Sequence, residues 1–117
     1  MKPGLIELNL ATNADLHELQ PILDINDAPV DMAGWPFKCQ LKFDENDAAV
    51  ALEVTVTVSA LGELTLSADM ALIAALLVAP RKKAVIKGDL LTKPYNGNYR
   101  ARLAYVEAIV ERGVSTL

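Results

Sequence analysis

The chain has 117 residues, a length that suits one folded domain with a single hydrophobic core. Hydrophobic residues make up 52% of it and charged residues 22%, which excludes intrinsic disorder, because disorder needs low hydrophobicity and high net charge. The net charge of −4 provides no long-range attraction to nucleic acid or to an anionic membrane. We therefore expect one domain over residues 1–117, with neither nucleic acid nor membrane as a partner.

Cysteine usage and the apolar runs predict the compartment. Cys39 is the only cysteine, which excludes an intramolecular disulfide and fits a reducing cytoplasm. The first residues, 1–4, run straight into an alternating segment without the apolar core of a signal peptide. The longest apolar run, 70–79, is far shorter than the roughly 20 residues that span a bilayer. The sequence thus predicts a cytoplasmic product without a signal peptide or a membrane segment.

Alternation of apolar and polar residues predicts strands in the first half of the chain. Residues 5–10 have the period of a strand with one buried side. Residues 17–25 form a second candidate strand, which Pro21 weakens because proline cannot donate to a ladder. Residues 35–43 and 50–58 alternate almost strictly, and the acidic segment between them suits a hairpin loop. The residues of these two strands predicted to face the core are Trp35, Phe37, Cys39, Leu41, Phe43, Leu52, Val54 and Val56.

The second half continues the strand pattern with one helical interruption. A turn at Gly62 leads into a predicted strand over 64–68. Residues 69–78 are rich in Ala and Leu and predict one short helix. Two further strands, over 84–91 and 99–110, flank an Asn-Gly pair of the kind that favours tight hairpins.

About seven short strands separated by turns, with one brief helix, predict an all-β fold. Because the strands have one apolar and one polar side, we expect them to be antiparallel. The pattern favours an immunoglobulin-like antiparallel β-sandwich over a barrel, with Trp35 in its core. The cysteine pair of antibody domains is missing, so the expected kinship is one of architecture alone.

Several segments together resemble small tail-associated domains of phages and prophages. They are the run 31–42 with its Gly-Trp pair, the Thr-Val strand that follows, the Lys-Gly-Asp-Leu-Leu segment at 87–91 and the closing residues 110–116. The N-terminal β-sandwich domains of baseplate upper proteins belong to this group. Where they often have an aromatic residue and a glycine, this chain has Gly88 and Val106, an exchange that two neighbouring strands could share. The resemblance implies a structural role in a virion or tail particle assembled in bacteria, without catalytic residues.

Candidate catalytic, metal-binding and nucleic-acid-binding residues each have a structural interpretation that we favour. Cys39 lies on the apolar side of its strand, as a buried inert thiol would. His17 is the only histidine, and the chain has no Gly-x-Ser-x-Gly motif to accompany it. The acidic segments 24–31 and 44–47 could offer oxygens to calcium but lack the spacing of a calcium loop. The basic triplet 81–83 lacks interleaved aromatic residues. We therefore predict no enzyme, no metal and no cofactor.

The last predicted strand carries apolar residues on both of its sides. If its even-numbered residues from 104 to 110 face the core, other apolar side chains remain outside. A β-bulge that exchanges the two sides, or a cover provided by the helix, would remove them from solvent. Otherwise an apolar patch remains, and such patches mark subunit contacts. The residues predicted to form this interface are Val85, Leu91, Leu103, Tyr105 and Ile109.

These observations predict a structural or assembly protein of phage or prophage tail origin. Its expected partners are other tail or baseplate proteins, or copies of itself in a homo-oligomer. The alternative is a carbohydrate-binding β-sandwich that presents Tyr95, Tyr99 and Tyr105 to a sugar. A small enzyme is a third class, which we disfavour because no nucleophile and base can be paired.

Overall fold

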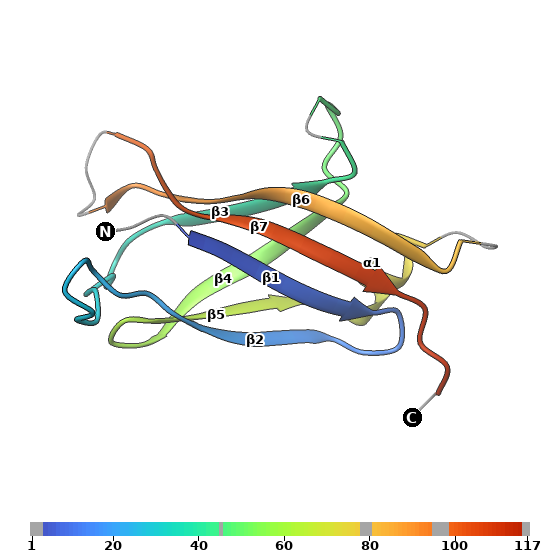
Figure 1. Ribbon diagram of the computed structural model, residues 1–117, viewed down its shortest axis with the longest axis horizontal. Coiled ribbons are helices and arrows are strands. Elements are labelled where there is room, and N and C mark those ends of the chain that lie inside the picture. The colour runs from blue at the N-terminus through green and yellow to red at the C-terminus, as the bar shows by residue number, and fades with distance from the viewer. Residues whose placement is uncertain (1–3, 45, 78–80, 95–98, 116–117) are drawn as a thin grey trace.

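The computed structural model describes residues 4–44, 46–77, 81–94 and 99–115. This part of the chain is mostly strand, and it contains seven strands and one short helix, as the sequence predicts (Figure 1). In chain order the elements are β1 (Gly4–Ala11), β2 (Leu16–Pro21), β3 (Phe37–Lys42), β4 (Leu52–Ala60), β5 (Glu63–Ala68), α1 (Met70–Ala74), β6 (Lys83–Thr92) and β7 (Ala101–Glu111).

The seven strands form one hydrogen-bonded sheet in the order β1-β7-β6-β3-β4-β5-β2. The sheet curls into a nearly closed, barrel-like shape, whose two edge strands β1 and β2 follow each other in the chain (Figure 1). β1 pairs with β7 in parallel, and the other neighbouring strands are antiparallel. The prediction of an entirely antiparallel arrangement is therefore wrong for β1. Parallel pairing needs a long connection, and here nearly the whole chain separates the two strands.

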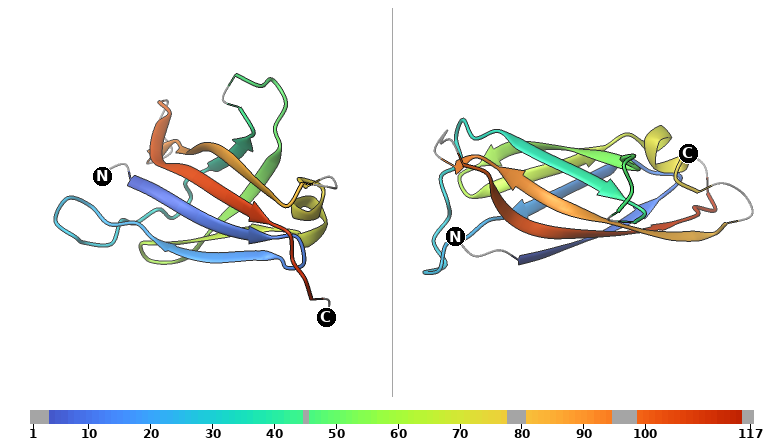
Figure 2. Two further views of the ribbon diagram at one scale, coloured as in Figure 1. Left: turned by 45° about the vertical axis from the view of Figure 1, so that its right-hand side comes forward. Right: turned by 90° about the horizontal axis from the view of Figure 1, so that it is seen from above.

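β4 belongs to two strand pairs along its length. Residues 52–54 pair with β3, whereas residues 55–60 pair with β5. Figure 2 shows β4 passing from the side of β3 to the side of β5. The turn after β4 contains Gly62 at φ +70°, where a side chain would also collide with Pro29. The predicted turn at Gly62 is thus confirmed, while the Asn-Gly pair lies outside the described residues.

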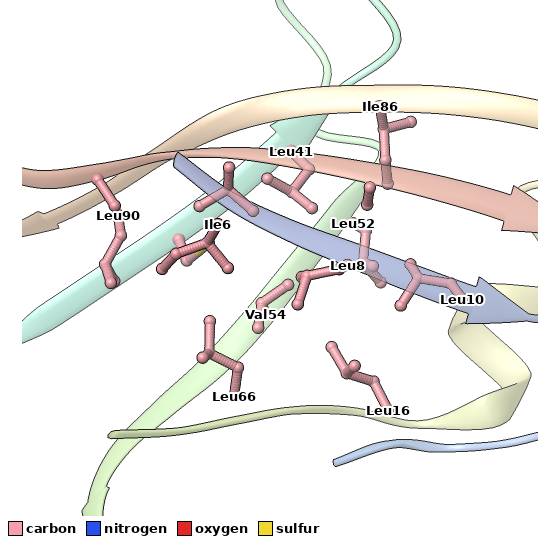
Figure 3. Packing of buried hydrophobic residues seen from close by; sticks show 14 of the residues in the cluster. Ile6, Leu8, Leu10, Leu16, Leu41, Leu52, Val54, Leu66, Ile86 and Leu90 are labelled. Carbon is pink, nitrogen blue, oxygen red and sulfur yellow. The ribbon is translucent and has the colours of Figure 1, made fainter. Parts of the chain in front are cut away.

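The inner side of the sheet encloses one cluster of buried apolar side chains, to which every strand contributes. Side chains from strands far apart in the sequence meet there, including Leu8 of β1, Leu41 of β3 and Leu66 of β5 (Figure 3). Each is at most 2% exposed. Burial of one such side chain contributes about 1.5–3 kcal/mol relative to its exposed state, so this cluster is the main source of stability.

The residues predicted to face the core lie in or against this cluster, with one exception. Those that are buried are Trp35, Cys39, Leu41, Leu52 and Val54, and those partly buried against them are Phe37 and Val56. The exception is Phe43, whose side chain is 44% exposed, so its predicted core position is wrong. β3 ends at Lys42 and the chain bends at Phe43, so the apolar alternation in the sequence continues beyond the strand.

The helix α1 covers one end of the curled sheet and contacts β1. Asp69 caps its first turn, and the carboxylate of Asp15 accepts the backbone N–H of Met70 at 2.7 Å. Ile73 is buried and fixes the helix to the core. The helix ends at Ala74, so it is shorter than the sequence predicts, and residues 78–80 lie outside the described part. Within the described residues, no helix combines the length and the apolar character that a bilayer crossing requires.

Candidate interaction surface

The outward side chains of β1, β7, β6 and β3 form one continuous surface, which we call the outer face. Its residues are Leu5, Glu7 and Asn9 of β1, Tyr105, Glu107 and Ile109 of β7, Val85, Lys87, Asp89 and Leu91 of β6, and Lys38, Gln40 and Lys42 of β3. The residues between them along each strand point toward the core, because side chains alternate along a strand. The outer face is therefore one side of four adjacent strands.

Tyr105 lies near the centre of the outer face. In the strand register it is opposite Asp89 of β6 and Leu5 of β1, and it is 50% exposed. The guanidinium of Arg102 lies 3.8 Å from the centre of the tyrosine ring, and its Nη1 atom is 3.5 Å from Oδ1 of Asp89. A cation–π contact of this kind contributes about 0.5–1 kcal/mol at an exposed site. Arg102 and Asp89 thus hold the ring in a defined position while leaving half of its surface accessible.

A shallow depression of about 450 Å³ lies over this part of the outer face. Apolar side chains line it at Leu5, Leu91 and Tyr105, and charged side chains from β3, β6 and β7 surround them. A smaller depression of about 330 Å³ adjoins it and shares Lys38 and Leu91. The described residues that line the two depressions include apolar, polar and charged side chains, which can offer apolar contact and ion pairs.

The structure places four of the five predicted interface residues on the outer face. Tyr105 and Val85 are exposed, the latter at 39%, and Leu91 and Ile109 are partly buried beside them. Val85 and Ile109 are direct partners in the register of β6 and β7. The helix α1 lies at one end of the sheet and contacts β1 (Figure 2).

Leu103 was predicted to belong to the interface, and this prediction is wrong because its side chain is only 3% exposed. The register of β6 and β7 shifts between Leu90 and Leu91, so β7 has one extra residue at this point. Such a β-bulge directs two consecutive side chains to the same side of a strand. Leu103 and Ala104 accordingly both point into the core. The sequence leaves a β-bulge in this strand open as one alternative, and the structure has a β-bulge at this position.

Leu5 of β1 and Arg102 of β7 line the depression beside Tyr105, and sequence reasoning missed both of them. Alternation in β1 places Leu5 on the outer side, but no local pattern indicates that β1 lies parallel to β7. Arg102 and Tyr105 are three residues apart, a spacing that puts side chains on opposite sides of a regular strand. The bulge at Leu103 brings them to the same side.

The other candidate sites are individual residues in different parts of the fold. Cys39 is fully buried, and this burial raises the pKa of its thiol to about 12, with smaller effects from the charges of Asp89 and Glu53. The thiol therefore stays protonated at neutral pH and is a poor nucleophile. His17 is exposed on the edge strand β2, opposite Ser67 of β5. The basic residues 81–83 are exposed ahead of and at the start of β6.

The acidic segments and the tyrosines do not assemble as their predicted roles require. Oδ1 of Asp24 accepts the backbone N–H of Asn26 at 2.7 Å, so this carboxylate stabilises its own turn. Within the described residues, no group of three or more acidic, histidine or cysteine side chains could hold a metal ion. Tyr99 is 59% exposed but does not line the depression at Tyr105, and Tyr95 lies outside the described residues.

No protein-family model matches the chain, and no curated protein is significantly similar to it. The function must therefore be argued from the surface itself.

Proposed function

We propose that this chain is a non-enzymatic structural or assembly protein that acts by burying its outer face against another protein surface. The observation that carries the proposal is the accessibility of apolar side chains on three neighbouring strands: Leu5 beside Tyr105, and Val85 on the other side of Lys87 and Glu107. They are 57%, 50% and 39% exposed, in that order. Accessible apolar side chains among charged ones are typical of protein–protein interfaces. The contact would release water from apolar surface, without chemical turnover.

We infer an immunoglobulin-like sandwich as the architecture behind this surface. In such folds one layer contains the third, sixth and seventh strands of the chain, and the other contains the first, second, fourth and fifth. The neighbours β7-β6-β3 and β4-β5-β2 follow this grouping, whereas β1 departs from it by pairing with β7. β4 pairs with both groups, which accounts for the continuous strand order.

We place the protein in a phage or prophage tail or baseplate, on the basis of the sequence resemblance. Tail particles are symmetric assemblies, in which small domains contact copies of themselves or neighbouring proteins. Neighbouring genes that encode tail proteins would support this placement, and neighbours of unrelated function would contradict it.

Sedimentation velocity over a range of concentrations tests the assembly role. We expect the wild-type particle to exceed the mass of one chain as the concentration rises, and Tyr105→Glu to weaken association more than tenfold. Loss of a central aromatic anchor commonly costs about 2 kcal/mol or more of binding free energy. Leu19→Glu is the matched control, because Leu19 is exposed to a similar extent, 51%, on β2, which contributes no residue to the outer face.

Circular dichroism of both variants separates loss of contact from loss of fold. A folded, monomeric Tyr105→Glu variant beside an associating Leu19→Glu variant is the expected result. A wild-type chain that stays monomeric at every concentration would refute the assembly role, as would equal loss of association in both variants. Chemical-shift changes at Tyr105 on addition of glycans would instead favour the carbohydrate-binding alternative.

A further inference from the structure

One row of charged residues on the outer face changes from basic to acidic across the sheet. One row across the four strands contains Lys42 of β3, Lys87 of β6, Glu107 of β7 and Glu7 of β1, in that spatial order. Like charges are therefore direct neighbours at both ends of the row, an arrangement that destabilises a sheet. In the described part of the chain, none of these four side chains forms a salt bridge. An opposing surface with complementary charges could therefore neutralise the like charges at the two ends of the row.

We infer that the surface that meets this row is the outer face of a second copy of the chain, related by a two-fold axis that runs parallel to the strands between β6 and β7. This inference rests on the proposed assembly function and deepens it by naming the partner. A half-turn about that axis places β6 opposite β7 of the other copy, and β3 opposite β1. Lys87 then faces Glu107, and Lys42 faces Glu7, twice each by symmetry.

Apolar and polar residues of β6 and β7 also match under this operation. Val85 faces Ile109, and Asp89 faces Tyr105, whose hydroxyl can donate to a carboxylate. These two pairs are complementary, whereas Leu5 of β1 lies opposite Gln40 of β3. The axis is therefore supported by the charged row and by the pairs of β6 with β7.

The charges disfavour a two-fold axis that is perpendicular to the strands and passes through the charged row. An axis perpendicular to the strands would place Lys87 opposite Lys87 and Glu107 opposite Glu107, which is repulsive. The charge pattern thus selects the axis parallel to the strands.

The size of the outer face predicts a reversible dimer. Four strands about 4.8 Å apart, each with roughly eight residues at about 3.3 Å per residue, cover roughly 500 Å². Two such faces bury about 1,000 Å² in total, the lower end of the range for specific interfaces. The fraction of dimer should therefore change with protein concentration, so that the effect of a charge reversal on the dissociation constant can be measured.

A charge-exchange experiment tests this pairing. Lys87→Glu places glutamates opposite each other in a homodimer, and Glu107→Lys places lysines opposite each other. We expect each variant alone to associate at least tenfold more weakly than wild type. An equimolar mixture, with one variant labelled with nitrogen-15, should form heterodimers in native mass spectrometry, because both opposing pairs are then attractive.

The double variant Lys87→Glu/Glu107→Lys controls for the possibility that the single variants associate more weakly because they unfold. It restores opposite charges within the row and across the proposed axis, so it should fold and associate as wild type does. Glu18→Lys on the exposed edge strand β2 reverses a charge away from the outer face and should leave association unchanged.

The possible failures are distinguishable. If wild type associates but the mixture shows no preference for heterodimers, this pairing is wrong while the assembly function stands. If the double variant folds but stays monomeric, the pairing is also wrong. If wild type never exceeds the mass of one chain, the assembly function and the pairing are both refuted.

Discussion

Cys39 shows how the environment of a residue decides its chemistry. Its side chain is fully buried in β3, and this burial raises the pKa of the thiol from 9.0 to about 12. The carboxylates of Asp89 and Glu53 add to the shift, because a negative charge nearby disfavours the thiolate. Cys39 therefore acts as a small apolar side chain of the core.

The raised pKa of Cys39 predicts a pH dependence of stability. Between about pH 9 and 12 the unfolded chain loses the thiol proton while the folded chain keeps it, so rising pH favours unfolding. We expect the free energy of unfolding of wild type to fall relative to that of Cys39→Ala by about 1.4 kcal/mol per pH unit in this range. Urea denaturation of both proteins at about pH 7, about pH 9 and about pH 10 measures the difference. A difference that does not change with pH would show that the thiol is accessible.

Gly88 of β6 shows how close packing against β3 restricts which residue a strand can hold at one position. A Cβ atom at Gly88 would collide with the backbone oxygen of Gln40 and with Leu41, both on β3. Val106 of β7 is the direct partner of Gly88. The two positions at which this chain differs from the family that it resembles are therefore neighbours in the sheet. The atoms that a larger side chain would meet nevertheless belong to β3. The close approach of β3, rather than the size of Val106, accounts for the glycine.

Gly88→Ala should therefore lower the free energy of unfolding by about 1–3 kcal/mol, because β3 must move to admit the methyl group. Gly4→Ala is the matched control, since no atom lies within 4 Å of a Cβ at that position of β1. Its effect should stay within about 0.5 kcal/mol. Urea denaturation, followed by the fluorescence of Trp35, measures both. Rescue of Gly88→Ala by Val106→Ala would contradict this explanation and favour an exchange between β6 and β7.

Local patterns predicted the elements well, because alternation and turn residues act over a few positions. Residues 35–43 and 50–58 gave β3, β4 and their antiparallel pairing, and Gly62 gave the turn to β5. Pairing between distant segments leaves no such local pattern. The parallel position of β1 depends on the path of the whole chain, and the bulge at Leu103 depends on the register with β6.

The same distinction explains which parts of the candidate surface the sequence could predict. Val85, Tyr105 and Ile109 follow from alternation within their own strands, and they lie on the outer face. The basic-to-acidic order of the charged row needs the spatial order of four strands that span residues 4–111. Glu7 lies next to Glu107 only because β1 closes the edge of the sheet beside β7. The charge pattern is thus a property of the whole molecule.

The charge pattern predicts that added salt weakens self-association of the whole molecule. The opposed pairs of Lys87 with Glu107 and of Lys42 with Glu7 would lie between two exposed surfaces, where ions screen them. Between about 0.01 M and 1 M salt the Debye length falls from about 30 Å to about 3 Å, so we expect the dissociation constant to rise at least severalfold. Sedimentation equilibrium at a series of sodium chloride concentrations measures it, and the double variant Lys87→Glu/Glu107→Lys should respond equally. Contact through apolar residues alone would be unaffected or strengthened by salt, and that outcome would contradict the opposed rows.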